Sequence, residues 1–367
     1  MTERNNSMDV YEELRQILDA HPTGAPKSEY FDEILKISFT PEEAQIATKM
    51  SFSPRGVGHL SEATGIDAGE LEEKLEAMCN KMVIFSTDRE DGKLYGLLPT
   101  IPGLFEFPFM KGGGTPKLDK LGELWEKYHR DAMGAAFGGS DTPLMRVLAV
   151  EKSFGAKNKA HPYEEVAHFI EQAEVIALTD CACRVSLGNC DRPRDVCLIF
   201  DNPAKFLIDR GYARSIGKEE AMDALDRAEK AGLVHTSNNS SDKANLICNC
   251  CPCCCTILRG RTQLDLPNAF ATSSFIAKVD ADECSGCGTC ADERCPMGAV
   301  EIVEEIAVVD EKRCIGCGLC VTGCPSSAIY LEDREPSHPV CGSVKEMGMK
   351  ILMEKGKLEE FIKISKR

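Results

Sequence analysis

One cysteine pattern occurs twice near the end of the chain, and the two copies begin thirty residues apart. Each copy has three cysteines at every third position, followed by a fourth cysteine that precedes a proline. The first copy comprises Cys284, Cys287, Cys290 and Cys295, and the second comprises Cys314, Cys317, Cys320 and Cys324. Thiolates at this spacing are typical ligands of a cubane iron–sulfur cluster. The repeat therefore predicts two [4Fe–4S] clusters, whose ligation would constrain much of the local fold.

The fourth cysteine predicts that each run contributes to both clusters. A tight loop of three cysteines can reach three irons of a cubane, and the fourth iron lies too far from that loop. In two-cluster ferredoxins the fourth cysteine of each run therefore binds the other cluster. The expected ligands are Cys284, Cys287, Cys290 and Cys324 for cluster I, and Cys314, Cys317, Cys320 and Cys295 for cluster II. Glycines at positions 286, 288, 316 and 318 let backbone N–H groups turn toward the sulfurs.

The repeat extends beyond the cysteines. Short strands are predicted before the two runs at 275–280 and 306–310, and after them at 298–300 and 327–329. Each half is thus a short strand, a ligand loop, a short helix and a short strand. Residues 272–333 resemble the bacterial dicluster ferredoxin domain, and this resemblance implies electron transfer through two [4Fe–4S] clusters.

The first run departs from the ferredoxin pattern at one place. Four residues separate Cys290 from Cys295, whereas three separate Cys320 from Cys324. We expect the loop to absorb the additional residue without loss of a ligand. The alternative interpretation is two structural zinc sites of four cysteines each, but the prolines and the repeat favour iron–sulfur clusters.

The cysteine content also bears on location. Nineteen of the 20 cysteines follow residue 180. The first residues are polar and lack the apolar segment of a signal peptide, and no run approaches the roughly 18 apolar residues of a membrane span. We therefore expect a cytoplasmic protein without membrane insertion, where thiols stay reduced and clustered cysteines bind metal. Many oxygen-sensitive thiolates also suggest an anaerobic organism.

The net charge of −16 indicates what the protein binds. Non-specific binding to nucleic acid depends on Lys and Arg side chains that neutralise phosphates, so this charge argues against it. An acidic surface suits docking to a basic patch on a redox partner. Solubility alone is the other explanation of the charge.

Residues 1–110 are predicted to be mainly helical, with a β-hairpin near their end. Thr40 and Glu43 form a capping box with a proline at the first helical position. Gly65 closes a short helix, Asp67 caps the next, and Asp91-Gly92 is a hairpin signal between two strands. Three helices and a hairpin in this order resemble a winged helix-turn-helix domain.

The helix that would enter a DNA groove is acidic. Residues 67–82 include Asp67, Glu70, Glu72, Glu73 and Glu76 against Lys74 and Lys81. Such a helix would repel phosphate, so we expect this domain to dock proteins or to be purely structural. Cys79 is expected to be a small core residue.

The middle of the chain contains a second group of cysteines. Strands at 144–150 and 175–178 flank a helix at 163–173, and this β-α-β order leads into the first of the cysteines. The ten cysteines are Cys181, Cys183, Cys190, Cys197, Cys248, Cys250, Cys251, Cys253, Cys254 and Cys255. Adjacent side chains diverge, so the six in 248–255 cannot all face one metal.

Three interpretations of these ten cysteines stay open: a further iron–sulfur cluster, structural zinc, and thiol-based disulfide or sulfur chemistry. The first is favoured because a further cluster would exchange electrons with the two clusters already predicted in the same chain. Residues 141–264 resemble uncharacterised iron–sulfur proteins of anaerobes, which implies no particular reaction. His161 and His235 are interpreted as ordinary surface or capping histidines.

The sequence predicts an α+β protein of several parts. They are a winged-helix-like domain at 1–110, a linker and helix at 111–140, a cysteine-rich α/β domain at 141–271, a dicluster ferredoxin domain at 272–335 and a helical tail at 336–367. The predicted function is electron transfer to or from a flavoprotein, hydrogenase or reductase subunit. The alternatives are a redox enzyme subunit that reacts at the middle cysteines and a redox-sensing winged-helix regulator.

The acidic helix gives a direct test of the regulator. We expect no appreciable binding of the protein to duplex DNA at physiological salt, measured by fluorescence anisotropy of a labelled duplex. The variant Glu72→Lys/Glu73→Lys serves as a control, because its reduced repulsion should raise any residual binding. Sub-micromolar binding by the unaltered protein that weakens steeply with salt would contradict the prediction.

Overall fold

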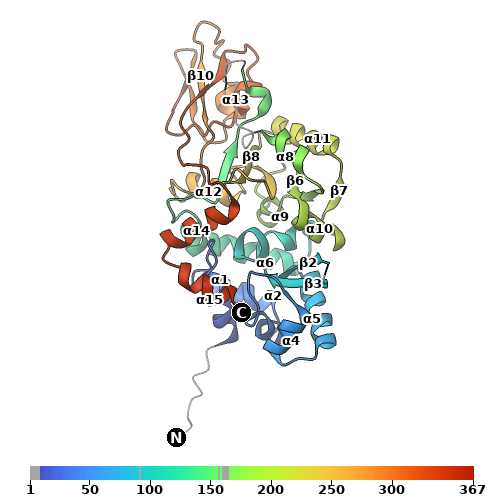
Figure 1. The fold of residues 1–367 in the computed structure, drawn as a ribbon. Coiled ribbons are helices and arrows are strands. Elements are labelled where there is room, and N and C mark those ends of the chain that lie inside the picture. Colours follow the sequence, from blue (N-terminus) through green and yellow to red (C-terminus); the bar gives the residue numbers. More distant parts are fainter. Residues whose placement is uncertain (1–8, 91, 156–157, 159–164) are drawn as a thin grey trace. The chain divides into compact units, whose positions relative to one another are not determined.

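The computed structural model describes residues 9–90, 92–155, 158 and 165–367 (Figure 1). Its contacts divide the chain into two compact units. The first unit is Met1–Phe137 with Leu352–Arg367, and the second is Gly138–Ile351. Both combine helices and strands, which fits the α+β class. In the described part of the chain, no helix has both the length and the apolar character that a bilayer span requires.

The first unit contains helices around a small sheet. Its helices are α1 (Val10–Asp19), α2 (Glu29–Ser38), α3 (Pro41–Ala47), α4 (Val57–Thr64), α5 (Ala68–Asn80), α6 (Pro116–Tyr128), α7 (Gly134–Phe137) and α15 (Leu358–Ser365). Its strands are β1 (Arg55–Gly56), β2 (Ile84–Arg89) and β3 (Gly92–Leu97), which form an antiparallel sheet in the order β1-β3-β2. The winged-helix relationship stays a prediction, although α3, α4, α5 and the β2–β3 hairpin follow the expected order.

Local sequence signals set the ends of these helices. The predicted capping box is present, since the Glu43 N–H donates to Thr40 Oγ1 at 3.2 Å and the Thr40 N–H donates to Glu43 Oε2 at 2.8 Å. Gly65 ends α4 in the left-handed conformation, with φ of 72°. The Asp67 carboxylate accepts from the N–H of Gly69 and caps α5. The cap at Asp67 defines the start of α5, the helix that carries the acidic residues.

Aromatic packing joins α2 to α6. The Phe31 ring is fully buried and stacks on Tyr128 with a centroid distance of 4.7 Å. It also meets the edge of Trp125 at 6.0 Å. The Tyr128 hydroxyl donates to the carbonyl of Pro26 at 3.0 Å, so this buried ring has its polar end satisfied.

The end of the chain belongs to the first unit. Lys357 forms an ion pair with Asp19 at 2.7 Å. The Arg55 guanidinium donates to the Arg367 carbonyl at 3.1 Å, and Arg367 in turn donates to the carbonyl of Thr48 at 2.9 Å. The locally basic tail therefore packs against the helices of this unit.

The second unit is built on a six-stranded sheet. Its order is β4 (Met145–Leu148), β8 (Val234–Asn238), β9 (Leu246–Cys250), β6 (Asp195–Phe200), β5 (Ile176–Asp180) and β7 (Arg214–Ile216). All neighbouring pairs are antiparallel. The helices are α8 (Val166–Gln172), α9 (Ala182–Leu187), α10 (Asp201–Asp209), α11 (Lys218–Lys230) and α12 (Thr256–Thr262).

This arrangement corrects the predicted β-α-β unit. Strands β4 and β5 are not neighbours, because β8, β9 and β6 lie between them. The helix between them begins at Val166, later than predicted, and residues 163–164 lie outside the described part of the chain. Strand β5 still leads directly into Cys181, which precedes α9.

One face of the sheet packs on α8 and α11. Leu198 of β6 and Ile247 of β9 belong to this core, together with Phe169 and Leu225 of the two helices. Side chains alternate along a strand. Cys197 and Cys248, each next to one of these core residues, consequently point to the other face, and the register Leu198↔Ile247 places them opposite each other.

The ferredoxin-like part of the second unit has the predicted twofold repeat. Strand β10 (Phe275–Val279) pairs with β13 (Ile329–Asp333), and β11 (Val300–Val303) pairs with β12 (Ile306–Val309). A helical turn at Cys290–Arg294 follows the first ligand loop, and α13 (Leu319–Thr322) follows the second. Helix α14 (Val344–Glu354) comes after this part and contains the boundary between the two units.

The buried aromatic cluster of the first unit predicts a large stability effect. We expect Phe31→Ala to lower the free energy of unfolding of this unit by about 3–5 kcal/mol, because it removes a whole buried ring. Met353→Ala is the matched control, because its side chain is 58% exposed and should change stability by less than about 0.5 kcal/mol. Chemical denaturation followed by tryptophan fluorescence of Trp125 measures both; similar effects for the two variants would contradict the prediction.

Candidate metal centres

The second cysteine run lines a cavity with mostly buried cysteines. The cavity has an empty volume of about 350 Å³ and is lined by Cys314, Cys317, Cys320 and Cys295, among others. Three of these four residues are buried. Burial raises the pKa of the Cys317 thiol to about 12. A cation that neutralises thiolates would offset this cost of charge, so the site suits a metal cluster.

The first run lines a more open cavity of about 280 Å³. Its cysteines are Cys284, Cys287, Cys290 and Cys324. Cys287 is exposed, and hydrogen bonds from Thr289 lower the pKa of its thiol. The exposed hydrophobic side chain of Ile302 also borders this cavity. The cysteines of this cavity are therefore more exposed than those of the cavity of the second run.

Each cavity is lined by three cysteines of one run and by the fourth cysteine of the other. These are the two sets expected from the sequence, so the structure brings together the residues of each set. Backbone N–H groups also point at two sulfurs of the first run: Ala307 donates to Cys284 Sγ at 3.4 Å, and Ala299 donates to Cys295 Sγ at 3.1 Å. Such donors stabilise thiolate ligands and tune the potential of a cluster. Ligation itself stays a prediction.

Two glycines allow the ligand loops to approach their neighbours. Gly286 and Gly316 have φ of +63° and +69°. A Cβ at Gly286 would collide with the carbonyl of Glu305, and one at Gly316 would collide with the carbonyl of Phe275. Glycine is therefore required at both equivalent positions of the repeat.

The additional residue of the first run is absorbed by a π-helical turn. The Cys295 N–H donates to the carbonyl of Cys290 at 3.0 Å, five residues earlier. A single π turn is the usual way to insert one residue into a helical segment. The turn leaves Cys295 in the wall of the cavity of the second run.

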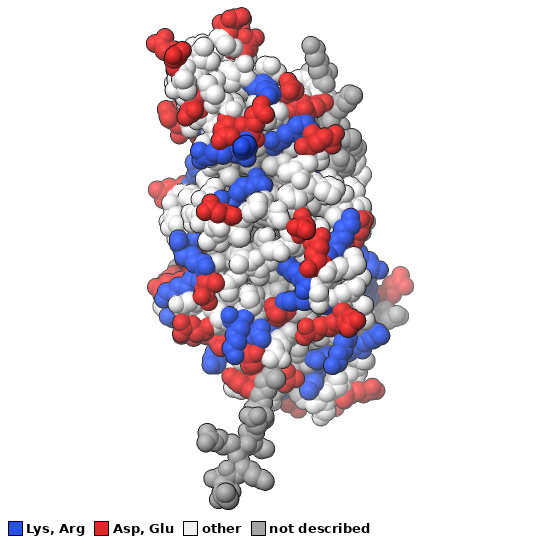
Figure 2. Space-filling model, turned by 90° about the vertical axis from the view of Figure 1, so that its left-hand side faces the viewer, with Lys and Arg blue, Asp and Glu red and all other residues white. Residues whose placement is uncertain are grey.

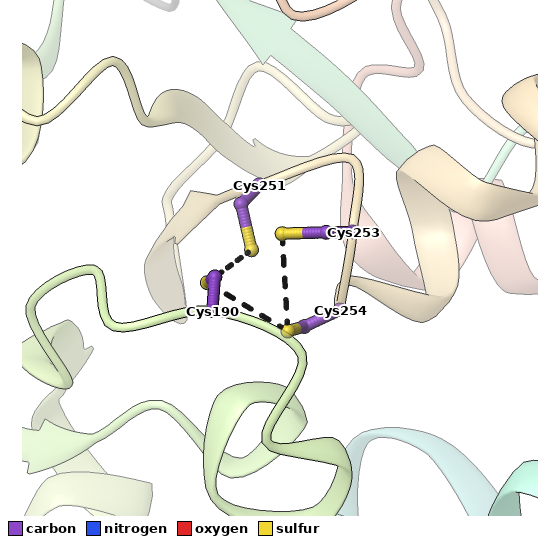
Figure 3. Close-up of side chains that lie close together, drawn as sticks. All are labelled: Cys190, Cys251, Cys253 and Cys254. Atoms are coloured by element: carbon purple, nitrogen blue, oxygen red, sulfur yellow. Dashed lines mark hydrogen bonds between the residues drawn. The ribbon is translucent and has the colours of Figure 1, made fainter.

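In the middle part, four of the ten predicted cysteines form a compact group. We call Cys190, Cys251, Cys253 and Cys254 the four-thiol centre (Figure 3). The Cys190 sulfur lies 3.8 Å from that of Cys251 and 3.9 Å from that of Cys254, and the sulfurs of Cys253 and Cys254 are 4.0 Å apart. All four sulfurs lie within 4.8 Å of one another. They come from the loop after α9 and from the turn after β9.

A buried arginine contacts this centre. Arg184 of α9 is fully buried, and its Nη1 donates to the Asn249 carbonyl at 2.9 Å and to Cys251 Sγ at 3.8 Å. Hydrogen bonds from Cys254 and from Arg184 lower the pKa of Cys251 to about 4. The centre therefore contains a thiol that favours its thiolate form, which is the form that binds metal.

The remaining six cysteines form a closed ring of neighbours. We call Cys181, Cys183, Cys255, Cys250, Cys248 and Cys197, in this order, the six-thiol ring. The side chain of each thiol shifts the pKa of the next, and Cys197 in turn shifts that of Cys181. The strand register also sets Cys197 opposite Cys248. In the described residues, the four-thiol centre is the only group of three or more possible ligands with all atoms within 4.8 Å of one another, so the ring is wider than that centre.

The middle and ferredoxin-like parts meet at the cavity of the second run. The Val150 N–H, just after β4, donates to the carbonyl of Cys317 at 3.0 Å. Gly318 lies against Ser153, where a Cβ would clash with the serine side chain. The Arg294 guanidinium donates to the carbonyls of Leu319 at 3.0 Å and Lys230 at 3.2 Å, and so joins the two runs to α11. The cavity of the second run consequently lies beside the middle part.

Comparison with protein families places the second run in a known domain type. The family described as 4Fe-4S binding domain matches residues 307–330. These residues contain most of β12, the second ligand loop and α13. The chain therefore contains a ferredoxin-type iron–sulfur domain in its C-terminal part. No curated protein matches the chain.

Other candidates from the sequence have no place in these groups. His235 is buried, its Nδ1 lies 2.5 Å from Asn249 Oδ1, and burial lowers its pKa. It is therefore a buried residue of the sheet and not the surface or capping histidine expected from the sequence, and it belongs to neither thiol group. His161 lies outside the described residues. Cys79 and Cys341 are buried in other parts of the chain. The closed six-thiol ring was not predicted, because it depends on strand register.

The crossed cysteine sets give a spectroscopic prediction. In anaerobically prepared protein, Cys324→Ala should perturb the same EPR signal of the reduced protein as Cys284→Ala, because both residues line one cavity. Cys295→Ala should perturb the other signal, together with Cys314→Ala. If Cys324→Ala and Cys314→Ala alter one signal and leave the second intact, the crossed assignment is wrong.

Proposed function

We propose that this chain is a cytoplasmic electron-transfer protein with two [4Fe–4S] clusters in its ferredoxin domain and further metal in its middle domain. The pair of cavities, each lined by four cysteines of the duplicated run, carries this proposal. When bound, such clusters supply one-electron transfer at potentials that span roughly −700 to +450 mV. The match of residues 307–330 to the 4Fe-4S binding domain supports the cofactor type.

The cysteines around the two cavities differ in exposure, and this difference suggests a path for electrons. Cluster I would sit at the surface, because Cys287 is exposed and Ile302 borders its cavity. Cluster II would be shielded, because Cys314, Cys317 and Cys320 are buried. We infer that a partner exchanges electrons at cluster I and that cluster II connects it with the middle cysteines.

The surface of the ferredoxin domain suggests the charge of the partner. Residues 272–335 contain 13 acidic and five basic residues. Figure 2 shows acidic side chains gathered over this part of the second unit. Exposed apolar residues lie among them, including Ile302, Val303 and Val308 of the β11–β12 hairpin. This combination suits a redox partner such as a flavoprotein, hydrogenase or reductase subunit with a basic and partly apolar docking patch.

The proposal predicts charge-dependent electron exchange. In protein first shown to contain at least eight irons with matching sulfide, the reduced clusters should react faster with a dicationic viologen than with a zwitterionic viologen of similar potential. We expect about a tenfold ratio at low salt that approaches one at about 1 M salt, where charges are screened beyond about 3 Å. Stopped-flow absorbance measures both rates.

Matched variants locate the effect. Glu301→Gln/Glu304→Gln/Glu305→Gln removes three charges beside the cavity of cluster I and should lower the rate ratio. Glu62→Gln/Glu72→Gln/Glu73→Gln removes the same charge from the first unit and should leave the ratio nearly unchanged. Equal effects of the two variants would refute docking at cluster I, and zinc in place of iron in the cysteine cavities would refute the electron-transfer function itself.

A further inference from the structure

The two thiol groups of the middle part differ in size, and this difference constrains their metals. A tetrahedral zinc ion with Zn–S bonds of about 2.3 Å places its sulfur ligands about 3.8 Å apart. The contacts in the four-thiol centre are 3.8, 3.9 and 4.0 Å. The centre therefore already has the dimensions of one ion surrounded by four thiolates.

The ferredoxin cavities provide an internal comparison. A cubane binds one thiolate at each of four separate irons, so its outer sulfurs stand farther apart than those on a single ion. In agreement, the thiols around the cavities of about 350 and 280 Å³ form no group within 4.8 Å among the described residues. The four-thiol centre is contracted relative to these two sites of the same protein.

The six-thiol ring is wider than the four-thiol centre. Its members come from β6, from β9, from the first turn of α9 and from the residues that directly precede α9 and α12. Cys197 lies opposite Cys248 in the register of β6 and β9, and Cys183 Sγ lies 3.9 Å from Oγ1 of Thr256, the residue after Cys255. No three of the six sulfurs lie within 4.8 Å of one another among the described residues. One ion could not contact all six thiolates. A core of several metals bridged by sulfide could, since each metal needs only one or two of the thiolates.

Arg184 is an independent indication of negative charge between the two groups. It is 0% exposed, and its Nε and Nη2 have no hydrogen-bond partner among the described residues. The thiols of Cys181 and Cys197 in the ring and of Cys251 in the four-thiol centre are the main groups that interact with its charge. A buried guanidinium is costly unless nearby negative charge compensates it. Metal–thiolate centres on both sides would supply that charge.

We propose that the middle domain holds two separate metal centres, a single tetrahedral ion in the four-thiol centre and a polynuclear iron–sulfur cluster in the six-thiol ring. Six thiolates exceed the four that a [4Fe–4S] cubane binds, so this cluster differs from those of the ferredoxin domain. Arg184 lies between the two centres as a fixed cation. The proposal deepens the proposed function and rests on it for the assignment of iron to the ring.

Metal and sulfide analysis of the full chain tests this division. In anaerobically prepared protein we expect at least four irons with matching sulfide beyond the eight of the ferredoxin domain, and one further ion. Cys253→Ala should remove that one ion and leave the sulfide unchanged. Cys183→Ala, and separately Cys248→Ala, should remove the additional iron and sulfide and leave the single ion. Cys341→Ala, at a buried cysteine outside both groups, is the control and should change neither.

Cobalt gives a second readout that does not depend on iron. Co²⁺ loaded into the four-thiol centre should produce the intense sulfur-to-cobalt charge-transfer absorption of a tetrathiolate site, which Cys253→Ala abolishes and Cys183→Ala retains. Loss of about four irons and four sulfides in Cys253→Ala would overturn the proposal, as would unchanged iron and sulfide in both ring variants. The EPR signals of the ferredoxin domain report the proposed function separately, because these variants leave its eight cysteines intact.

Discussion

Mutual repulsion of thiolates is the constraint on which the second unit depends. Eighteen of its cysteines lie in four groups: two cavities, the four-thiol centre and the six-thiol ring. Buried thiols can form thiolates together only if cations lie among them. Burial of Cys317 and Cys320 raises the pKa of both, so without metal the cavity of the second run would contain neutral thiols with little reason to converge. Metal binding and folding of this unit are therefore expected to be coupled.

The antiparallel sheet decides which cysteines meet. Strand β9 directs Cys248 and Cys250 to one face because alternate residues share a face, and the register with β6 sets Cys248 opposite Cys197. Cys251 follows directly and packs on the other side with Val196 and Ala228. A shift of one residue in this register would turn Cys248 and Cys250 to the opposite face, away from Cys197. The hydrophobic contacts of Leu198 and Ile247 with α8 and α11 therefore also fix the positions of the thiols.

This dependence explains how far the sequence could predict the site. The duplicated run was readable because its ligands are close in sequence, and local signals placed the capping box at Thr40, the C-cap at Gly65 and the β2–β3 hairpin. The ten middle cysteines were found, but their division was not, because it requires the pairing of β6 with β9, nearly fifty residues apart. The β-α-β prediction was wrong for the same reason: the pattern showed strands and a helix but not which strands pair. The π turn before Cys295 could not be predicted either, since an inserted residue in a loop has many possible conformations.

Arg184 connects the chemistry of the middle domain with its fold. Its Nη1 binds the Asn249 carbonyl on β9, and Asn249 Nδ2 donates to the carbonyl of Val196 on β6, so the guanidinium is held by the two strands that supply ring cysteines. A fixed cation stabilises the more negatively charged state of any nearby redox centre and raises its potential. A second arginine, Arg334, donates from Nη2 to the carbonyl of Cys314 at 3.0 Å beside the cavity of the second run, but its side chain is only partly buried. On the proposed function, the fully buried Arg184 would raise the potential of its neighbouring centre more than the partly exposed Arg334 raises that of the ferredoxin cluster, which would draw electrons toward the middle cysteines.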